Sequence, residues 1–248
     1  MSKVMLITGA SRGIGAATAR LAAAEGHALC LNFRQRHDAA KELLDELQAS
    51  GARAVSIEAD VADEAQVVKL FAAIDAEFGR LDVLVNNAGI LEQQMRLDEM
   101  DRARLERVFA VNVFGSFQCA REAVRRMSTR HGGQGGAIVN VSSIAAKFGA
   151  PNEYTDYAAA KGAIDSMTLG LAKEVAAEGI RVNAVRPGVI RTDIHASGGE
   201  PGRVDRVSSS VPMGRGGEAE EVAEAILWLA SDRASYITGA LLDISGGR

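Results

Sequence analysis

The chain has 248 residues, of which 47% are hydrophobic and 24% are charged, as in an ordinary globular protein. Its 28 lysines and arginines against 32 aspartates and glutamates give a formal net charge of −4. This balance excludes a basic nucleic-acid footprint over the whole chain and a disordered acidic tail. A chain of this length buries roughly 70–75% of its unfolded surface, so it needs no disulfide or metal to hold it together.

Two cysteines, Cys30 and Cys119, form no CxxC motif and have no nearby histidine, so we expect small buried residues in a reducing compartment and no metal site. The first residues form a short apolar run that ends in glycine, without the long apolar region and cleavage site of a signal peptide. No stretch reaches the roughly 18 apolar residues of a transmembrane helix. We therefore expect a cytoplasmic protein with no membrane partner and no nucleic-acid partner.

Short apolar runs alternate with amphipathic stretches along the chain. In chain order, we expect a strand at 3–8, a helix at 13–25, a strand at 28–33, a helix at 38–49, a strand at 54–58, a helix at 64–78, a strand at 81–86, a long helical zone at about 101–130, a strand at 137–142, a helix at 157–177, a strand at 181–185, a helix at 219–230 and a strand at 241–244. Continuous apolar strands that alternate with helices predict an α/β fold with right-handed βαβ units and a parallel sheet. Because no linker-like stretch interrupts the chain, we expect a single domain over residues 1–248.

Two segments break this rhythm. Residues 130–136 indicate a turn before a strand, and residues 190–212 are rich in Ser, Gly and Arg with little periodicity. A structureless loop of that length inside a compact domain is usually functional, so we expect a substrate loop at about 190–212. The alternative is a tolerated surface insertion.

Glycines follow the first expected strand at a distinctive spacing. Gly9, Gly13 and Gly15 lie between that strand and the next helix, the context in which such a pattern binds a dinucleotide. Gly9 permits a tight turn, Gly13 lets the backbone approach a pyrophosphate, and Gly15 permits close packing of the helix on the sheet. The helix N-terminus then offers N–H groups to phosphate. The alternative is a plain turn with a helix cap.

Three further motifs accompany the glycines in order. Asn86-Asn87-Ala88-Gly89 ends the fourth expected strand, Tyr157-Ala158-Ala159-Ala160-Lys161 opens a helix fourteen residues after Ser143, and Pro187-Gly188 ends the sixth strand. Together these motifs resemble the classical short-chain dehydrogenase/reductase (SDR) family over essentially the whole chain, with most similarity to uncharacterised bacterial glucose-dehydrogenase-like members. The resemblance implies a doubly wound Rossmann domain whose seven-stranded parallel sheet has the order 3-2-1-4-5-6-7.

Tyr157 and Lys161 share one face of a helix because they lie four residues apart. An ammonium beside a phenol is expected to lower the phenol pKa from about 10 toward the working pH, so that the phenol exchanges a proton with a carbonyl or alcohol oxygen. In the family, this tyrosine is the acid/base and the lysine also holds the nicotinamide ribose. Tyr154 has no such lysine four residues on.

The family serine normally lies thirteen residues before the tyrosine, where this chain has Ile144. One residue inserted within 147–155 explains the offset and makes Ser143 the expected catalytic serine, with Ser142 as the alternative. Its hydroxyl would stabilise the substrate oxygen. Asn112 matches the family asparagine that holds a water for proton relay, and its alternative role is that of a structural amide.

The resemblance also implies a cofactor-binding set. It comprises Gly9, Ser11, Arg12, Gly13, Ile14, Gly15, Arg34, Asp60, Val61, Asn87, Ala88, Gly89, Tyr157, Lys161, Pro187, Gly188, Ile190 and Thr192. After the second strand, no acid that could accept hydrogen bonds from the ribose of NAD occurs before Asp38, whereas Arg34 is placed to bind a 2′-phosphate. We therefore expect NADP(H) in preference to NAD(H), whose use stays open.

The expected function is hydride transfer between NADP(H) and a carbonyl or secondary alcohol, with a sugar or polyol as the favoured substrate. One alternative is a 3-oxoacyl-(acyl-carrier-protein) reductase, whose acidic partner would dock on a basic patch such as Arg125, Arg126 and Arg130. Another is a non-catalytic dinucleotide-sensing protein. The family resemblance also implies a homotetramer.

Overall fold

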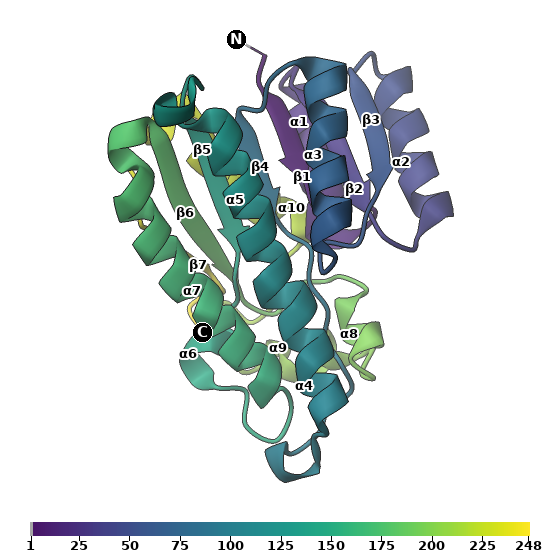
Figure 1. Ribbon diagram of the computed structural model, residues 1–248. Helices are drawn as coiled ribbons and strands as arrows, with labels where there is room; N and C mark the ends of the chain where they lie inside the picture. Colours follow the sequence, from purple (N-terminus) through teal and green to yellow (C-terminus); the bar gives the residue numbers. More distant parts are fainter. Residues whose placement is uncertain (1) are drawn as a thin grey trace.

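A computed structural model describes residues 2–248 and contains one parallel sheet of seven strands. The strands are β1 (Val4–Ile7), β2 (Ala28–Phe33), β3 (Ala54–Glu58), β4 (Val83–Asn86), β5 (Gly136–Val141), β6 (Ile180–Pro187) and β7 (Leu241–Ile244). Their order is β3-β2-β1-β4-β5-β6-β7, which confirms the predicted Rossmann topology (Figure 1). Since all strands are parallel, their carboxyl ends meet at one edge.

Helices cover both faces of the sheet. The main ones are α1 (Gly13–Ala24), α2 (His37–Ala49), α3 (Glu64–Phe78), α4 (Arg102–Phe109), α5 (Gly115–Met127), α7 (Thr155–Val175) and α10 (Ala219–Ala230). Residues of α1, α2 and α10 share one buried apolar cluster with the sheet, and residues of α3, α5 and α7 share another. Figure 1 shows α3, α5 and α7 over the near face. No helix in residues 2–248 is both long and apolar enough to cross a membrane.

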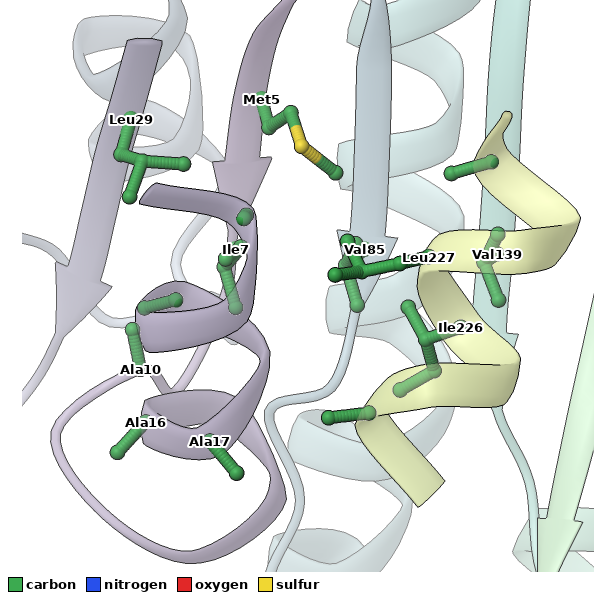
Figure 2. Close-up of a cluster of buried hydrophobic side chains, with 14 of the residues drawn as sticks. Met5, Ile7, Ala10, Ala16, Ala17, Leu29, Val85, Val139, Ile226 and Leu227 are labelled. Carbon is green, nitrogen blue, oxygen red and sulfur yellow. The ribbon is translucent and has the colours of Figure 1, made fainter. Parts of the chain in front are cut away.

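Alternate side chains of each strand feed these two clusters, as the pleat requires. Figure 2 shows one of them, in which Ile226 and Leu227 of α10 pack near Val85 of β4 and Val139 of β5. Cys30 belongs to the opposite cluster, as does Cys119. Burial raises the pKa of both thiols to about 12, so they remain protonated and act as small apolar residues, as expected.

The helical zone expected at 101–130 is interrupted. A π-helical turn, Ala110–Phe114, separates α4 from α5, and a 3-10 turn, Thr129–His131, follows α5. Such π turns are frequent at functional sites, and this one contains Asn112. Gly115 opens α5, where an added Cβ would lie 2.7 Å from Cγ2 of Val61. The π turn therefore lies directly beside the loop between β3 and α3, which contains Val61.

The expectation of a structureless loop at 190–212 was wrong. This segment contains two short helices, α8 (Ile194–Ser197) and α9 (Arg203–Ser208). Val204 and Val207 of α9 are buried against Val189, so two apolar side chains three residues apart are enough to fix a turn of helix. Another short helix, α6 (Ala145–Phe148), also escaped prediction. Figure 1 places α6, α8 and α9 beyond the carboxyl ends of the strands.

The buried cluster under α10 gives a stability prediction. Ile226 is fully buried, whereas Val68 of α3 is 43% exposed. Replacing Ile226 with alanine should lower the free energy of unfolding by about 2–5 kcal/mol, because the removed atoms leave a cavity. Val68→Ala should change it by less than about 1 kcal/mol. Urea denaturation of both variants measures the difference, and equal losses would contradict this account of the core.

Candidate active site

The glycine turn after β1 has the conformation expected of a phosphate-binding turn. Gly9 and Gly13 have positive φ angles of 62° and 54°, which favour glycine. An added Cβ on Gly15 would lie 2.6 Å from Gly9 O, so close packing also requires glycine there. Arg12 precedes α1 without a side-chain cap, and the first turn of α1 has no acidic residue. The free N–H groups of this turn can therefore donate hydrogen bonds to a bound anion.

The turn opens into a groove of about 580 Å³ at the β1–β4 crossover, where open α/β sheets bind ligands. Twelve of the proposed cofactor residues line it: Gly9, Ser11, Arg12, Gly13, Ile14, Arg34, Asp60, Val61, Asn87, Ala88, Gly89 and Thr192. Gly15 lies below the groove, in keeping with the packing role expected of it.

Hydrogen bonds join the loops that follow β1 and β4. Asn87 Nδ2 donates to Thr8 O at 2.9 Å and to Gly9 O at 3.0 Å. In return, the Thr8 hydroxyl accepts hydrogen bonds from the backbone N–H groups of Asn87 and Ala88, both at 3.0 Å. The position of the glycine turn is thus fixed by the neighbouring loop, and the side chain of Asn87 has a structural role that the sequence did not indicate.

A second hollow, a cleft of about 690 Å³, continues from the groove and shares Ile14, Asn87, Gly89 and Thr192 with it. Ser142, Ser143, Tyr157 and Lys161 line this cleft together. So do Pro187, Gly188 and Ile190 from the loop after β6. The structure therefore brings the proposed catalytic serine, tyrosine and lysine to the end of the proposed cofactor groove.

The two candidate serines have different partners. Ser142 Oγ donates to Lys161 O at 3.1 Å, which joins the end of β5 to the backbone of α7. Ser143 Oγ accepts a hydrogen bond from Ala145 N at 3.1 Å. Its hydroxyl also lies close enough to the Tyr157 phenol to lower the pKa of that phenol, against the larger effect of burial. This geometry favours Ser143 as the serine that contacts the substrate oxygen.

The expectation of a lowered pKa for Tyr157 is not met in this structure. Burial raises the pKa of the phenol to about 12 and outweighs the opposite effect of the Ser143 hydrogen bond. Lys161 Nζ lies 5.6 Å from the centre of the Tyr157 ring and donates to Val141 O at 2.7 Å. Burial also lowers the lysine pKa to about 8, against the weaker effect of Asp165. The ammonium therefore lies over the face of the ring.

Asn112 does not line the cleft surface. Its Oδ1 accepts a hydrogen bond from Ile90 N at 2.9 Å, and its Nδ2 donates to Ile90 O at 3.0 Å. These bonds match the structural alternative, since they join the π turn to the loop after β4. Each polar atom of the amide retains capacity for one more hydrogen bond, so a role toward water stays a proposal.

The cofactor groove contains several arginines at its outer end. Arg34 pairs with Asp60 at 3.3 Å, a contact between the ends of two different strands that the sequence did not reveal. Asp60 Oδ1 also accepts from Ala62 N at 2.9 Å, within the turn that precedes α3, whose N-cap is Asp63. Arg36 lines the groove and has no ion-pair partner within the described part of the chain.

One residue that lines the groove, Asn32, was not predicted from the sequence. Asn32 interrupts the apolar run of β2, and its Nδ2 donates to Ala59 O at 2.9 Å while Oδ1 accepts from Gly9 N at 3.4 Å. A lone amide at the end of an otherwise apolar strand is the signal that could have found it. Arg248, which lines the cleft beside Phe148, gave no such signal.

Comparison with known proteins agrees with this geometry. A family model described as enoyl-(acyl carrier protein) reductase matches residues 9–248. The chain is 56% identical over 245 residues to the uncharacterized oxidoreductase YgfF of Escherichia coli (strain K12), with 99% of both chains covered. The chain belongs to the short-chain dehydrogenase/reductase family. It is therefore an oxidoreductase of that family.

More distant SDR relatives have more specific names. The chain is 44% identical to a cis-4-hydroxycyclohexanecarboxylate dehydrogenase of Sinomonas cyclohexanicum, over 99% of this chain and 96% of the relative. It is 35% identical to a 3-oxoacyl-(acyl-carrier-protein) reductase of Staphylococcus aureus, over 100% and 98%. A short-chain dehydrogenase of Burkholderia cenocepacia in complex with NADP has a TM-score of 0.90 and 32% identity, over 99% and 97%.

The two serines can be separated by mutation. Ser143→Ala should lower kcat by about 10²–10³-fold, because it removes a donor to the substrate oxygen. Ser142→Ala should lower kcat less, because its hydroxyl bonds to the backbone of α7. Steady-state kinetics of both variants compares them. Equal or reversed losses would show that the inserted residue lies elsewhere in the loop.

Proposed function

We propose that this SDR enzyme transfers a hydride between NADP(H) and a carbonyl or secondary alcohol substrate. The observation that carries the proposal is the meeting of Ser143, Tyr157 and Lys161 in a cleft that continues into the glycine-lined groove. The groove supplies phosphate-binding N–H groups, and the cleft supplies a proton donor beside the place where a nicotinamide ring would end.

The choice of NADP(H) rests on charge. A 2′-phosphate adds about −2 charge, and the outer end of the groove offers the guanidinium groups of Arg12, Arg34 and Arg36. Asp60 competes for Arg34, but Arg36 is unpaired in the described part of the chain. The Burkholderia relative in complex with NADP supports the same assignment.

In the proposed reduction, Ser143 donates a hydrogen bond to the substrate oxygen and Tyr157 gives its phenolic proton to that oxygen. When bound, NADPH supplies the hydride that reaches the carbonyl carbon. With a pKa of about 12, the phenol is protonated at neutral pH, which is the form that reduction needs. Lys161 places a positive charge under the ring, which stabilises the phenolate left after proton transfer. The water-holding role of Asn112 belongs to this proposal as well.

The substrate is proposed to be a cyclic or polyhydroxy alcohol or its ketone, with a sugar or polyol as one form. Its support is the mixed lining of the cleft, where apolar side chains such as Leu91 and Phe148 lie together with Glu153, His195 and Arg203. The name of the Sinomonas relative, a dehydrogenase of a hydroxycyclohexanecarboxylate, supports a cyclic alcohol. The neighbouring polar residue Asn152 is exposed and does not line the cleft.

A 3-oxoacyl-(acyl-carrier-protein) reductase is the second candidate, and the Staphylococcus relative favours it. The expected docking patch for an acidic carrier protein does not support this candidate, because each arginine of the patch already has an acidic partner within this chain. Arg125 pairs with Glu122 at 2.7 Å, Arg126 pairs with Asp75 at 2.7 Å, and Arg130 lies 4.0 Å from Glu178. A non-catalytic dinucleotide sensor would not require the serine, tyrosine and lysine that the cleft contains.

We also propose assembly into a homotetramer, in the cytoplasm, as the family resemblance implies. Exposed apolar side chains support an association between copies. Phe114, Phe117 of α5 and Leu169 of α7 are 57%, 48% and 42% exposed. Light scattering of the purified protein measures the assembly directly.

Tyr157→Phe tests the proposed chemistry. It should leave NADPH binding nearly intact and lower kcat by about 10²–10⁴-fold, because only the transferable proton is lost. Tyr154→Phe is the control, because its hydroxyl donates to Gly198 O at 3.2 Å and has no lysine beneath it. Its loss should be much smaller. Turnover of a ketone panel by the Tyr157 variant at the wild-type rate would overturn the assignment.

Substitutions at Arg34 and Arg36 test the proposed preference for NADP(H) over NAD(H). The wild type should have a higher kcat/KM with NADPH than with NADH for the same ketone, and Arg34→Ala should reduce that ratio about tenfold or more. Arg34→Ala combined with Arg36→Ala should abolish the preference. An equal or better kcat/KM with NADH in the wild type would refute the NADP(H) assignment. An unchanged ratio in the variants would refute only the residues.

A further inference from the structure

Three polar side chains stand on one wall of the catalytic cleft. His195 comes from α8, Arg203 from α9, and Glu153 from the loop before α7, and all three line the hollow that also contains Tyr157 and Ser143. They come from segments that are separated in sequence and meet beyond the carboxyl ends of the strands (Figure 1). The proposed chemistry at Tyr157 and Ser143 uses none of the three.

His195 has one hydrogen bond and one unpaired nitrogen. Its Nε2 lies 2.9 Å from Ile190 O, and because a carbonyl oxygen only accepts, the proton of the neutral ring must be on Nε2. Nδ1 therefore carries a lone pair. The residue is only 9% exposed, and Nδ1 is buried with no hydrogen-bond partner among the described residues. Burial lowers the histidine pKa, so the ring stays neutral and Nδ1 stays an acceptor.

The charged side chains near this histidine are two arginines and two glutamates, which pair with one another. Arg203 pairs with Glu153 at 2.5 Å and with Glu200 at 3.4 Å, and Arg206 lies 3.3 Å from Glu153 and also pairs with Glu200. Two guanidinium groups and two carboxylates thus balance. At Arg203 and Arg206, a carboxylate-bearing ligand would have to displace a carboxylate that is already in place. A hydroxyl group of a ligand meets no such competition.

We infer that His195, Glu153 and Arg203 form a hydroxyl-binding subsite, in which His195 Nδ1 accepts a hydrogen bond from a substrate hydroxyl other than the reacting one. The inference rests on the proposed function and narrows its substrate class to compounds with a second hydroxyl. A buried acceptor without a donor costs free energy that such a ligand recovers on binding. Because Nδ1 is shielded from solvent, the hydroxyl must enter the cleft wall, which requires a local shift of α8.

Two substitutions at His195 distinguish the contributions of its two ring nitrogens. The amide nitrogen of glutamine reaches the position of Nε2, so His195→Gln keeps a donor to Ile190 O and removes the acceptor at Nδ1. The shorter asparagine amide reaches the position of Nδ1, so His195→Asn retains an acceptor there. The readout is the ratio of kcat/KM for the ring isomers of hydroxycyclohexanone to kcat/KM for cyclohexanone, with NADPH. A ratio cancels any general loss of activity in a variant.

The wild type should favour at least one hydroxycyclohexanone isomer, and His195→Gln should reduce this preference by about tenfold, the size of one hydrogen bond. His195→Asn should retain more of the preference than His195→Gln. The same ratio in wild type and His195→Gln overturns the subsite and leaves the proposed function standing, as does the absence of any preference in wild type. Either outcome would mean that Nδ1 of His195 accepts a hydrogen bond from an internal water or from no group at all. If wild type reduces no ketone, the proposed function falls and the subsite falls with it.

Discussion

The hydrogen bonds between Thr8 and the Asn87 loop are the constraint on which the rest of the site depends. Parallel strands bring the carboxyl ends of β1 and β4 to one edge, but the loops beyond them are free to diverge at a crossover. Here, the hydroxyl of Thr8 accepts from two consecutive N–H groups, while Asn87 Nδ2 donates back to Thr8 and Gly9. An added Cβ on Gly9 would lie 2.9 Å from Ala88 Cα. The phosphate turn and the floor of the cleft therefore form one rigid unit.

The proposed catalytic side chains are held by a similar contact, between β5 and α7. Lys161 Nζ donates to Val141 O, and Ser142 Oγ donates to Lys161 O, so the end of β5 and the first turns of α7 are joined twice. At the start of α7, a buried ion pair of 2.7 Å joins Asp156 to Arg104 of α4. Breaking such a pair would leave a buried charge, so it fixes the position of the helix that carries Tyr157. Because these contacts hold the backbone of α7 against β5 and α4, the side chains proposed for catalysis can stay partly desolvated.

Much of this arrangement could be predicted from the sequence, because it depends on local patterns. The apolar runs gave the strands, and motifs directly after strand ends, such as Gly9–Gly15 and Asn87–Gly89, had to lie at the carboxyl edge once the sheet was parallel. What could not be predicted depends on contacts between distant segments. Asp60 meets Arg34 only because β2 and β3 are neighbours. The raised pKa of Tyr157 follows from burial, which no spacing of Tyr and Lys specifies. The helix α9 depends on two buried valines, Val204 and Val207, within a polar segment.

The two ends of the continuous hollow differ in how their charges are balanced, and this difference separates two kinds of specificity. At the groove end, Arg36 is unpaired within the described chain and Arg34 shares a single carboxylate, so a doubly charged phosphate meets excess positive charge. At the cleft end, Arg203 and Arg206 are matched by Glu153 and Glu200. At these two arginines a second anion gains little, since each new ion pair would replace an existing one. In the proposed subsite, recognition beside them therefore comes from directed hydrogen bonds, and the buried Nδ1 of His195, which has no partner among the described residues, is an acceptor for one.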